Sequence, residues 1–199
     1  MTTKEAIIYE SLKLFSVNGF EAVSTRMIAK AVGASDAVIY KHFKSKKEIF
    51  DTIVRVCQDR YFKKRSEVKL ETMCWRDVED ICLGMFEFQI SDEWIVMFRQ
   101  MLMLEQFRNP EIGEIYRTTF IEAPIKNMAE MFKILIDQGY MKKGNPEMYA
   151  MELYAPFFLY HTVGKDKDIT KIKNNLKEHV TSFRKNVVTD EVYLELKDS

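Results

Sequence analysis

Residues 25–43 of the chain read Thr25-Arg-Met-Ile-Ala-Lys-Ala-Val-Gly-Ala-Ser-Asp-Ala-Val-Ile-Tyr-Lys-His-Phe43. Ile28 and Val32 in this stretch are four residues apart, so they share one face of a short helix. Gly33 then interrupts the helical pattern, because glycine adopts a left-handed turn geometry without steric cost. Ser35 follows and is placed to cap a second short helix with its hydroxyl. Two short helices joined by such a turn predict a helix-turn-helix, whose second helix enters the major groove of DNA.

The second helix of this motif has an inward and an outward face. Val38 and Ile39 are expected to point into the core. The next helix begins at Ser45-Lys46-Lys47-Glu48, which has the pattern of a capping box. The outward positions of the second helix are Asp36, Ala37, Tyr40 and Lys41.

This region, from about residue 5 to residue 55, resembles the tetracycline-repressor (TetR) family of bacterial regulators. The chain departs from the family pattern at Ala34, where Val is common, and at Ala37, where Gly or another small residue is frequent. The resemblance implies an all-α protein of about nine helices. It further implies an N-terminal helix-turn-helix domain of the homeodomain-like three-helix type, followed by a helical ligand-binding and dimerisation domain. The matching residues are Thr25, Ile28, Ala29, Ala31, Gly33, Ser35, Tyr40, His42, Phe43, Lys46 and Glu48.

The resemblance also implies roles for individual side chains at the DNA. Arg26 matches a position that can reach a base, and arginine can grip guanine through two hydrogen bonds. Lys46 places a like charge at the positive end of a helix, which is locally unfavourable and favours a phosphate partner. A lysine that only solvates the helix start is the alternative. Asp36 would repel phosphate and would rather accept from a cytosine amino group. The predicted DNA-binding residues are Thr25, Arg26, Ser35, Asp36, Ala37, Tyr40, Lys41, His42 and Lys46.

Charge is distributed unevenly along a chain whose 30 basic and 30 acidic residues balance. Residues 1–65 hold 13 basic and 7 acidic residues, whereas residues 66–199 hold 17 basic and 23 acidic residues. A basic head on an acidic body is typical of a polyanion-binding module joined to a part that binds something else. An ordinary solvated basic surface is the alternative.

The cysteines and the apolar runs of the chain indicate where in the cell the protein is expected. Cys57, Cys74 and Cys82 have neither the spacing of a disulfide framework nor that of a zinc site, which fits a reducing cytoplasm. The N-terminus lacks the pattern of a signal peptide. The longest apolar run, Leu153–Tyr160, is too short to span a membrane. We therefore expect a cytoplasmic protein without a metal site.

The rest of the chain follows helical periodicity, with Pro124 and Pro156 inside long helices that they should kink. The expected division is a DNA-binding domain over 1–45 and an effector-binding and dimerisation domain over 46–199, with helix 46–65 as the connector. Helices are predicted over about 4–18, 46–65, 74–90, 92–107, 110–138, 146–163 and 168–188.

The last long helix carries one continuous apolar seam, and the helix before it is apolar nearly all round. A helix that is apolar nearly all round must be covered on two sides. We therefore expect a homodimer in which each chain contributes both helices. A sandwich within one chain is the alternative. The predicted interface residues are Met151, Phe157, Ile169, Ile172, Leu176, Val180, Phe183 and Val187.

Methionine and aromatic residues gather in the middle of the chain, with nine of the twelve methionines between Met85 and Met151. Such side chains make adaptable apolar pockets, although they more often form plain core. Arg99, Arg117, Thr119 and Glu122 could add polar recognition or could be solvated surface residues. The predicted lining is Trp94, Phe98, Met101, Phe107, Tyr116, Phe120, Met128, Tyr154, Phe158 and His161.

These patterns together predict a transcriptional regulator and not an enzyme. The chain has no Gly-rich phosphate loop and no His-Glu-x-x-His, Gly-x-Ser-x-Gly or Cys-x-x-Cys motif, so no cofactor is predicted. We expect a homodimer that represses by binding a palindromic operator in double-stranded DNA and is released by a partly apolar small molecule. The alternatives are a DNA-bound structural or cell-division factor without an effector, and a helical small-molecule binder.

Overall fold

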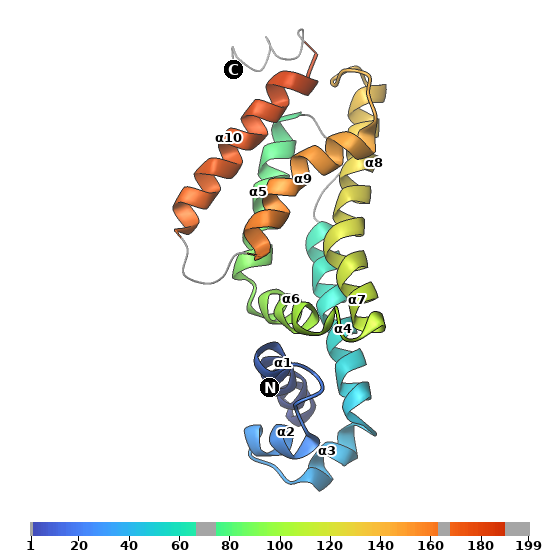
Figure 1. The fold of residues 1–199 in the computed structure, drawn as a ribbon, viewed down its shortest axis with the longest axis vertical. Helices are drawn as coiled ribbons and strands as arrows, with labels where there is room; N and C mark the ends of the chain where they lie inside the picture. The colour runs from blue at the N-terminus through green and yellow to red at the C-terminus, as the bar shows by residue number, and fades with distance from the viewer. Residues whose placement is uncertain (1, 67–74, 163–167, 190–199) are drawn as a thin grey trace. The chain divides into compact units, whose positions relative to one another are not determined.

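The computed structural model of the chain describes residues 2–66, 75–162 and 168–189 (Figure 1). Within these ranges the chain is helical, and the predicted helices occur with their ends within two residues of the expected positions, apart from the stretch 110–138. Residue 163, the predicted end of helix 146–163, and Cys74 lie outside the described residues. The helices are α1 (Thr3–Asn18), α2 (Thr25–Ala31), α3 (Asp36–His42), α4 (Lys46–Arg65), α5 (Trp75–Ser91), α6 (Glu93–Glu105), α7 (Pro110–Arg117), α8 (Ala123–Asp137), α9 (Pro146–Thr162) and α10 (Ile169–Val187).

The stretch 110–138 is not the single helix that the periodicity predicts. α7 ends at Arg117, a π-helical turn labelled η2 covers Thr118–Glu122, and α8 follows. Pro124, at the start of α8, has no N–H to donate to the carbonyl of Phe120 four residues earlier. The hydroxyl of Tyr154 donates to that carbonyl instead, at 2.7 Å. The proline therefore falls at the start of a new helix, next to a local change of helical type.

The chain forms two compact units, which we describe separately. Unit 1 consists of Met1–Arg65 and Ile90–Arg117, and unit 2 of the described parts of Ser66–Gln89 and Thr118–Ser199. Unit 1 therefore contains all of α4 together with α6 and α7. The predicted boundary between residues 45 and 46 separates the DNA-binding part of the chain from the rest by function. The division into compact units does not test it, so it stays a prediction.

Aromatic packing organises the core of unit 1. Phe20 follows the end of α1, and its ring contacts Phe15 and Phe50 edge-on, with centroids 5.3 and 5.1 Å apart. This geometry suits the charge distribution of aromatic rings. Phe20 thus joins α1 to α4 and fixes where the chain enters α2. Further buried side chains of this core include Leu12, Ile28, Ile39, Phe43, Ile49 and Ile53.

In unit 2, the apolar seam of α10 is covered within the chain. Phe183 packs against Phe132 of α8 and Tyr149 of α9, with ring centroids 5.7 and 6.2 Å apart. Phe157, also a predicted interface residue, is buried against Phe86. This is the sandwich within one chain, the alternative to a dimer contact. It corrects the assignment of Phe157, Ile172, Leu176, Val180, Phe183 and Val187, because side chains buried by their own chain cannot also cover a partner.

Candidate nucleic-acid interface

The helix-turn-helix is built by a cap, a glycine turn and a second short helix. Ser24 caps α2, since its Oγ accepts a hydrogen bond from the backbone N–H of Met27 at 3.2 Å. Gly33 has φ +67°, the left-handed geometry that the sequence predicts. Ser35 occupies the N-cap position of α3, but its side chain makes no capping hydrogen bond, so the expected capping role is wrong.

The two faces of α3 divide as the sequence predicts. Ile39 is buried and Val38 is half-buried, and both anchor α3 to the core of unit 1. Ala37, Tyr40 and Lys41 are exposed on the outward face. A small residue, a phenol and an ammonium there give close approach, a hydrogen-bonding group and a positive charge.

Two polar contacts join α2 to α3 on this exposed side. The Thr25 Oγ1 and Tyr40 hydroxyl lie 3.4 Å apart, close enough for one hydroxyl to donate to the other. The Arg26 Nε lies 3.6 Å from the Asp36 Oδ2, and these side chains are 88% and 40% exposed. The structure thus brings four of the predicted DNA-binding residues together in pairs, each pair spanning the two helices.

Lys46 has a different environment from the one the sequence suggests. Its ammonium donates to the backbone carbonyls of Phe20 and Glu21, at 2.8 and 3.3 Å, and lies 4.3 Å from the centroid of the Phe20 ring. A phosphate partner is expected for a charge that has no favourable neighbour at a helix start. The structure supplies such neighbours, so Lys46 holds the loop between α1 and α2 against the start of α4.

The first turn of α4 contains half of the expected capping box. The backbone N–H of Glu48 donates to the Ser45 Oγ at 3.1 Å. The Glu48 carboxylate accepts from the N–H of Lys44, one residue before the position that a capping box requires.

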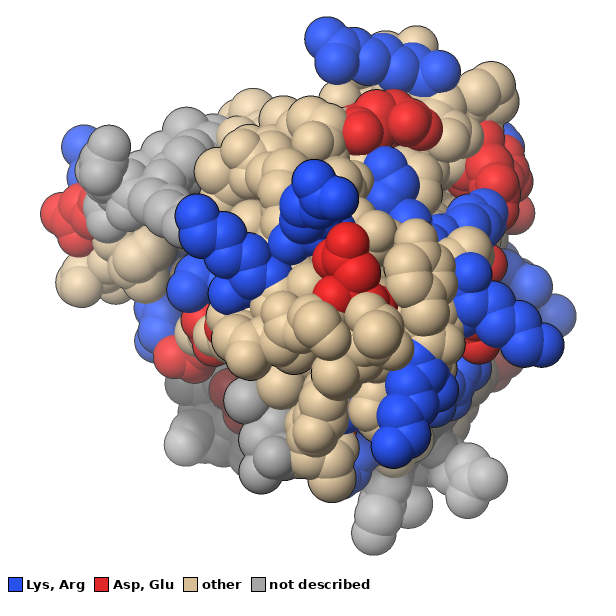
Figure 2. All heavy atoms as spheres, turned by 90° about the horizontal axis from the view of Figure 1, so that it is seen from below, with Lys and Arg blue, Asp and Glu red and all other residues tan. Residues whose placement is uncertain are grey.

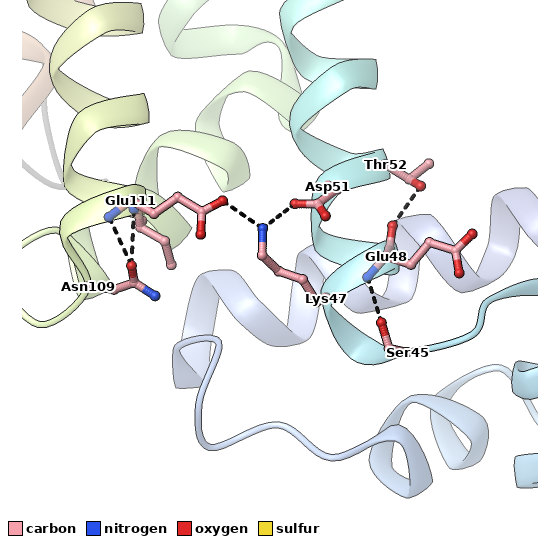
Figure 3. A network of polar contacts seen from close by, with 8 residues as sticks. Ser45, Lys47, Glu48, Asp51, Thr52, Asn109 and Glu111 are labelled. Carbon is pink, nitrogen blue, oxygen red and sulfur yellow. Dashed lines mark hydrogen bonds and ion pairs between the residues drawn. The ribbon is translucent and has the colours of Figure 1, made fainter.

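Lys47 connects this turn of α4 to the first turn of α7 (Figure 3). Its Nζ lies 2.6 Å from the Asp51 Oδ1 and 2.7 Å from the Glu111 Oε1. Hydrogen bonds to these two carboxylates raise the pKa of Lys47. Glu111 is itself placed by Asn109, whose side-chain oxygen accepts from the Glu111 N–H.

The face that carries α2 and α3 is rich in positive charge. Residues 25–44 contain Arg26, Lys30, Lys41 and Lys44, all exposed, against a single acidic residue, Asp36. Figure 2 views the molecule from the side on which α2 and α3 lie in Figure 1, and shows Lys and Arg at several places with fewer acidic side chains among them. This balance suits the phosphates of a nucleic acid.

The predicted pocket residues are divided equally between the two units. In unit 1, Phe98, Met101 and Tyr116 are buried and Trp94 is half-buried, but Phe107 is 94% exposed after the end of α6. Phe107 is therefore a surface residue, a correction of the prediction. In unit 2, the structure buries Phe120, Tyr154 and His161 and half-buries Met128 and Phe158.

Arg99 is a buried residue, whereas the sequence favoured a solvated one. It lies four residues after Ile95 and three before Leu102, both fully buried, and this spacing was the signal that could have revealed its position. Burial raises the pKa of Tyr116, and the positive charge of Arg99 opposes that shift. Thr119 is also buried, and Arg117 and Glu122 are exposed.

None of the helices in the described part of the chain has the length and apolar character needed to cross a membrane.

Comparison with known proteins gives a match for the head. Residues 7–53 match the model of bacterial regulatory proteins of the tetR family. The chain is 34% identical over 76 residues to the nucleoid occlusion factor SlmA of Mannheimia succiniciproducens, and this match covers 38% of the chain and 35% of SlmA. It is 24% identical over 156 residues to IcaR of Staphylococcus aureus, a helix-turn-helix negative transcriptional regulator of a biofilm operon, covering 70% of the chain and 83% of IcaR.

Solved structures extend the likeness of fold over nearly the whole chain. A putative tetR-family transcriptional regulator from Mesorhizobium loti has a TM-score of 0.71 at 18% identity, covering 95% of this chain and all of that one. A putative transcriptional regulator from Saccharomonospora viridis, solved with choline, has a TM-score of 0.66 at 20% identity, covering 94% and 97%. At such identities the likeness shows the fold.

Proposed function

Because the chain belongs to the tetR family of bacterial regulatory proteins, we propose that it is a homodimeric transcriptional repressor, released from its operator by a partly apolar small molecule. The observation that carries this proposal is the pairing of α2 and α3. Their exposed face presents Arg26, Tyr40 and Lys41, and the stretch around them has one acidic residue against four basic ones. Such a face suits a major groove flanked by phosphates.

The second part of the proposal is a dimer. A single short reading helix contacts few bases, and twofold pairing places two such helices about 34 Å apart, or a multiple of that, along a palindromic site. α9 offers an exposed apolar face for this purpose, formed by Met148, Met151, Ala155 and Leu159. Of the predicted interface residues, Met151 and Ile169 keep exposed side chains. We place the dimer contact on this face of α9.

The third part is the effector. Unit 2 contains buried aromatic side chains around His161. The His161 ring stacks on the Phe86 ring, with centroids 5.2 Å apart. The choline complex of the Saccharomonospora viridis regulator supports a small-molecule ligand in a protein of this fold. An effector releases the operator only by binding one shape of the dimer more tightly than the other. α4 is the proposed connector, and the link from Lys47 to Glu111 ties it to α7, after which the chain continues directly into unit 2.

DNA binding is tested by gel shift against fragments of the source genome. Wild type should retard a small subset of fragments. Lys41→Ala, which removes an exposed charge from α3, should weaken that binding. Lys177→Ala removes an exposed charge from α10 and serves as the matched control that should bind like wild type. Failure of wild type to prefer any fragment would refute the proposed function.

The match to SlmA motivates a second candidate, a DNA-bound factor without an effector. Thermal unfolding across a library of small apolar and cationic compounds separates the two. A compound that stabilises the protein and also releases the preferred fragment supports the repressor. Retention of the fragment in the presence of every stabilising compound supports the second candidate.

A further inference from the structure

We propose that Asp36 is a positioning residue that sets a guanine preference in each operator half-site by orienting Arg26. This inference rests on the proposed function, because it describes how the same α2–α3 face reads bases. Arg26 is the second residue of α2 and Asp36 the first residue of α3, so the contact between them crosses the turn of the motif. Their side chains meet through the Arg26 Nε and the Asp36 Oδ2, 3.6 Å apart.

The atom through which Arg26 pairs decides what the rest of the guanidinium can do. Guanine is read in the major groove by two parallel hydrogen bonds to its N7 and O6, and the two terminal nitrogens of arginine supply them. Here the carboxylate is nearest to Nε. A guanine that is bound by the two terminal nitrogens does not need this atom. The pairing therefore leaves the two Nη groups for a base.

Orientation matters because the Arg26 side chain is otherwise free to move. It is 88% exposed, and a long exposed side chain loses rotamer freedom when it is fixed on DNA. A carboxylate 3.6 Å away favours the rotamers that keep the two charges together, and this lowers the cost, as pre-organisation does generally. A misdirected arginine would instead reach the nearest phosphate, which carries no sequence information.

The pairing also explains an acidic residue on a basic face. An unpaired carboxylate at the start of a reading helix would repel phosphates and weaken binding to every sequence. The positive charge of Arg26 offsets the negative charge of Asp36 locally, and Asp36 still orients the Arg26 guanidinium. The expected result of removing Asp36 is thus a change in selectivity, which differs from the uniform gain in affinity that removal of a plain repulsive charge gives.

The test is selection of bound sequences from a randomised DNA duplex library, using full-length wild type, Asp36→Ala, Arg26→Ala and the double variant. Wild type should enrich guanine at one position per half-site. Asp36→Ala should reduce that enrichment by up to about fivefold, the upper end of what an exposed ion pair contributes, and leave the other positions unchanged. In the Arg26→Ala background, adding Asp36→Ala should not change base preference further.

The outcomes separate the hypotheses. If Asp36→Ala keeps the guanine preference and binds all sequences more tightly, Asp36 is only a repulsive charge and the inference is wrong. If it alters base preference equally with and without Arg26, its effect comes through α3 itself, and the inference is also wrong. Melting temperatures of all four proteins monitor the folding of α3. Absence of enrichment by wild type would instead overturn the proposed function.

Discussion

The hydroxyl of Tyr154 in α9 donates a 2.7 Å hydrogen bond to the backbone carbonyl of Phe120 in η2. The bond is buried, and it serves a carbonyl that Pro124 cannot serve because proline has no N–H. Tyr154 therefore has a structural role in unit 2, in addition to any contact with a ligand. It holds the π-helical turn against α9.

Replacing Tyr154 with Phe should destabilise the protein. The substitution keeps the ring and leaves a buried carbonyl without this donor, which costs about 1–3 kcal/mol of unfolding free energy. For a chain of this length, each kcal/mol corresponds to a decrease of roughly 2–4 °C in Tm. Thermal unfolding monitored by circular dichroism measures the change.

Two controls accompany this substitution. Tyr140→Phe removes a hydroxyl from an exposed ring and should leave the Tm unchanged. Pro124→Ala restores an N–H at position 124, so Tyr154→Phe should cost less in that background. Equal costs in the two backgrounds would show that Pro124 is not the reason for the bond.

Lys46→Ala and Lys41→Ala should differ in kind. Lys46 donates to two backbone carbonyls, so its loss should lower the Tm and weaken binding to DNA through the loop that it holds. Lys41 is exposed on α3, so its loss should leave the Tm unchanged, reduce affinity and flatten the dependence on salt. Melting curves and binding at several salt concentrations measure both effects. An unchanged Tm for Lys46→Ala would instead support the predicted contact between Lys46 and a DNA phosphate.

Local signals in the sequence were enough to predict most of the helices. The turn at Gly33 and the apolar periodicity of each helix act over a few residues. The break at η2 could not be predicted in this way. A proline in the sequence indicates that an α-helical bond is missing, but the donor that replaces it, Tyr154, is thirty-four residues away.

The sequence also could not predict which side chains from different helices contact one another. The sequence predicts that Arg26, Asp36 and Lys46 are charged residues of the DNA-binding face, but their contacts depend on how α1, α2, α3 and α4 pack. The seam of α10 shows the same limit. Its spacing predicts that one face is covered, and only packing against α8 and α9 decides that its own chain covers it.

Lys47 and Glu111 should be energetically coupled. Because both side chains are largely exposed, the coupling free energy should be modest, about 0.2–1 kcal/mol, and salt should reduce it. A double-mutant cycle with Lys47→Met and Glu111→Gln, followed by urea unfolding at low and high salt, measures it. The pair of half-buried Lys173 and exposed Glu87 in unit 2 serves for comparison. A coupling near zero at low salt would remove this contact from the proposed connection between α4 and α7.

Leu159→Glu should separate the proposed dimer. Leu159 is 59% exposed on the apolar face of α9, so a carboxylate there should cost little in the folded monomer but would be buried and unpaired in the dimer. Sedimentation at micromolar concentration should change from dimer to monomer. Lys177→Glu alters an exposed residue of α10 and should remain dimeric. If Leu159→Glu still sediments as a dimer, the contact lies elsewhere.

Cys57 and Cys82 should be unreactive until the protein unfolds. Burial raises the pKa of each thiol to about 12. At pH 8 very little of either thiol would be in the thiolate form that reacts. Because Cys74 lies outside the described residues, the measurement uses the variant Cys74→Ser. A coloured disulfide reagent should give no signal with the native variant and two thiols per chain in denaturant. Rapid labelling of the native variant would show that one of the two sites opens without global unfolding.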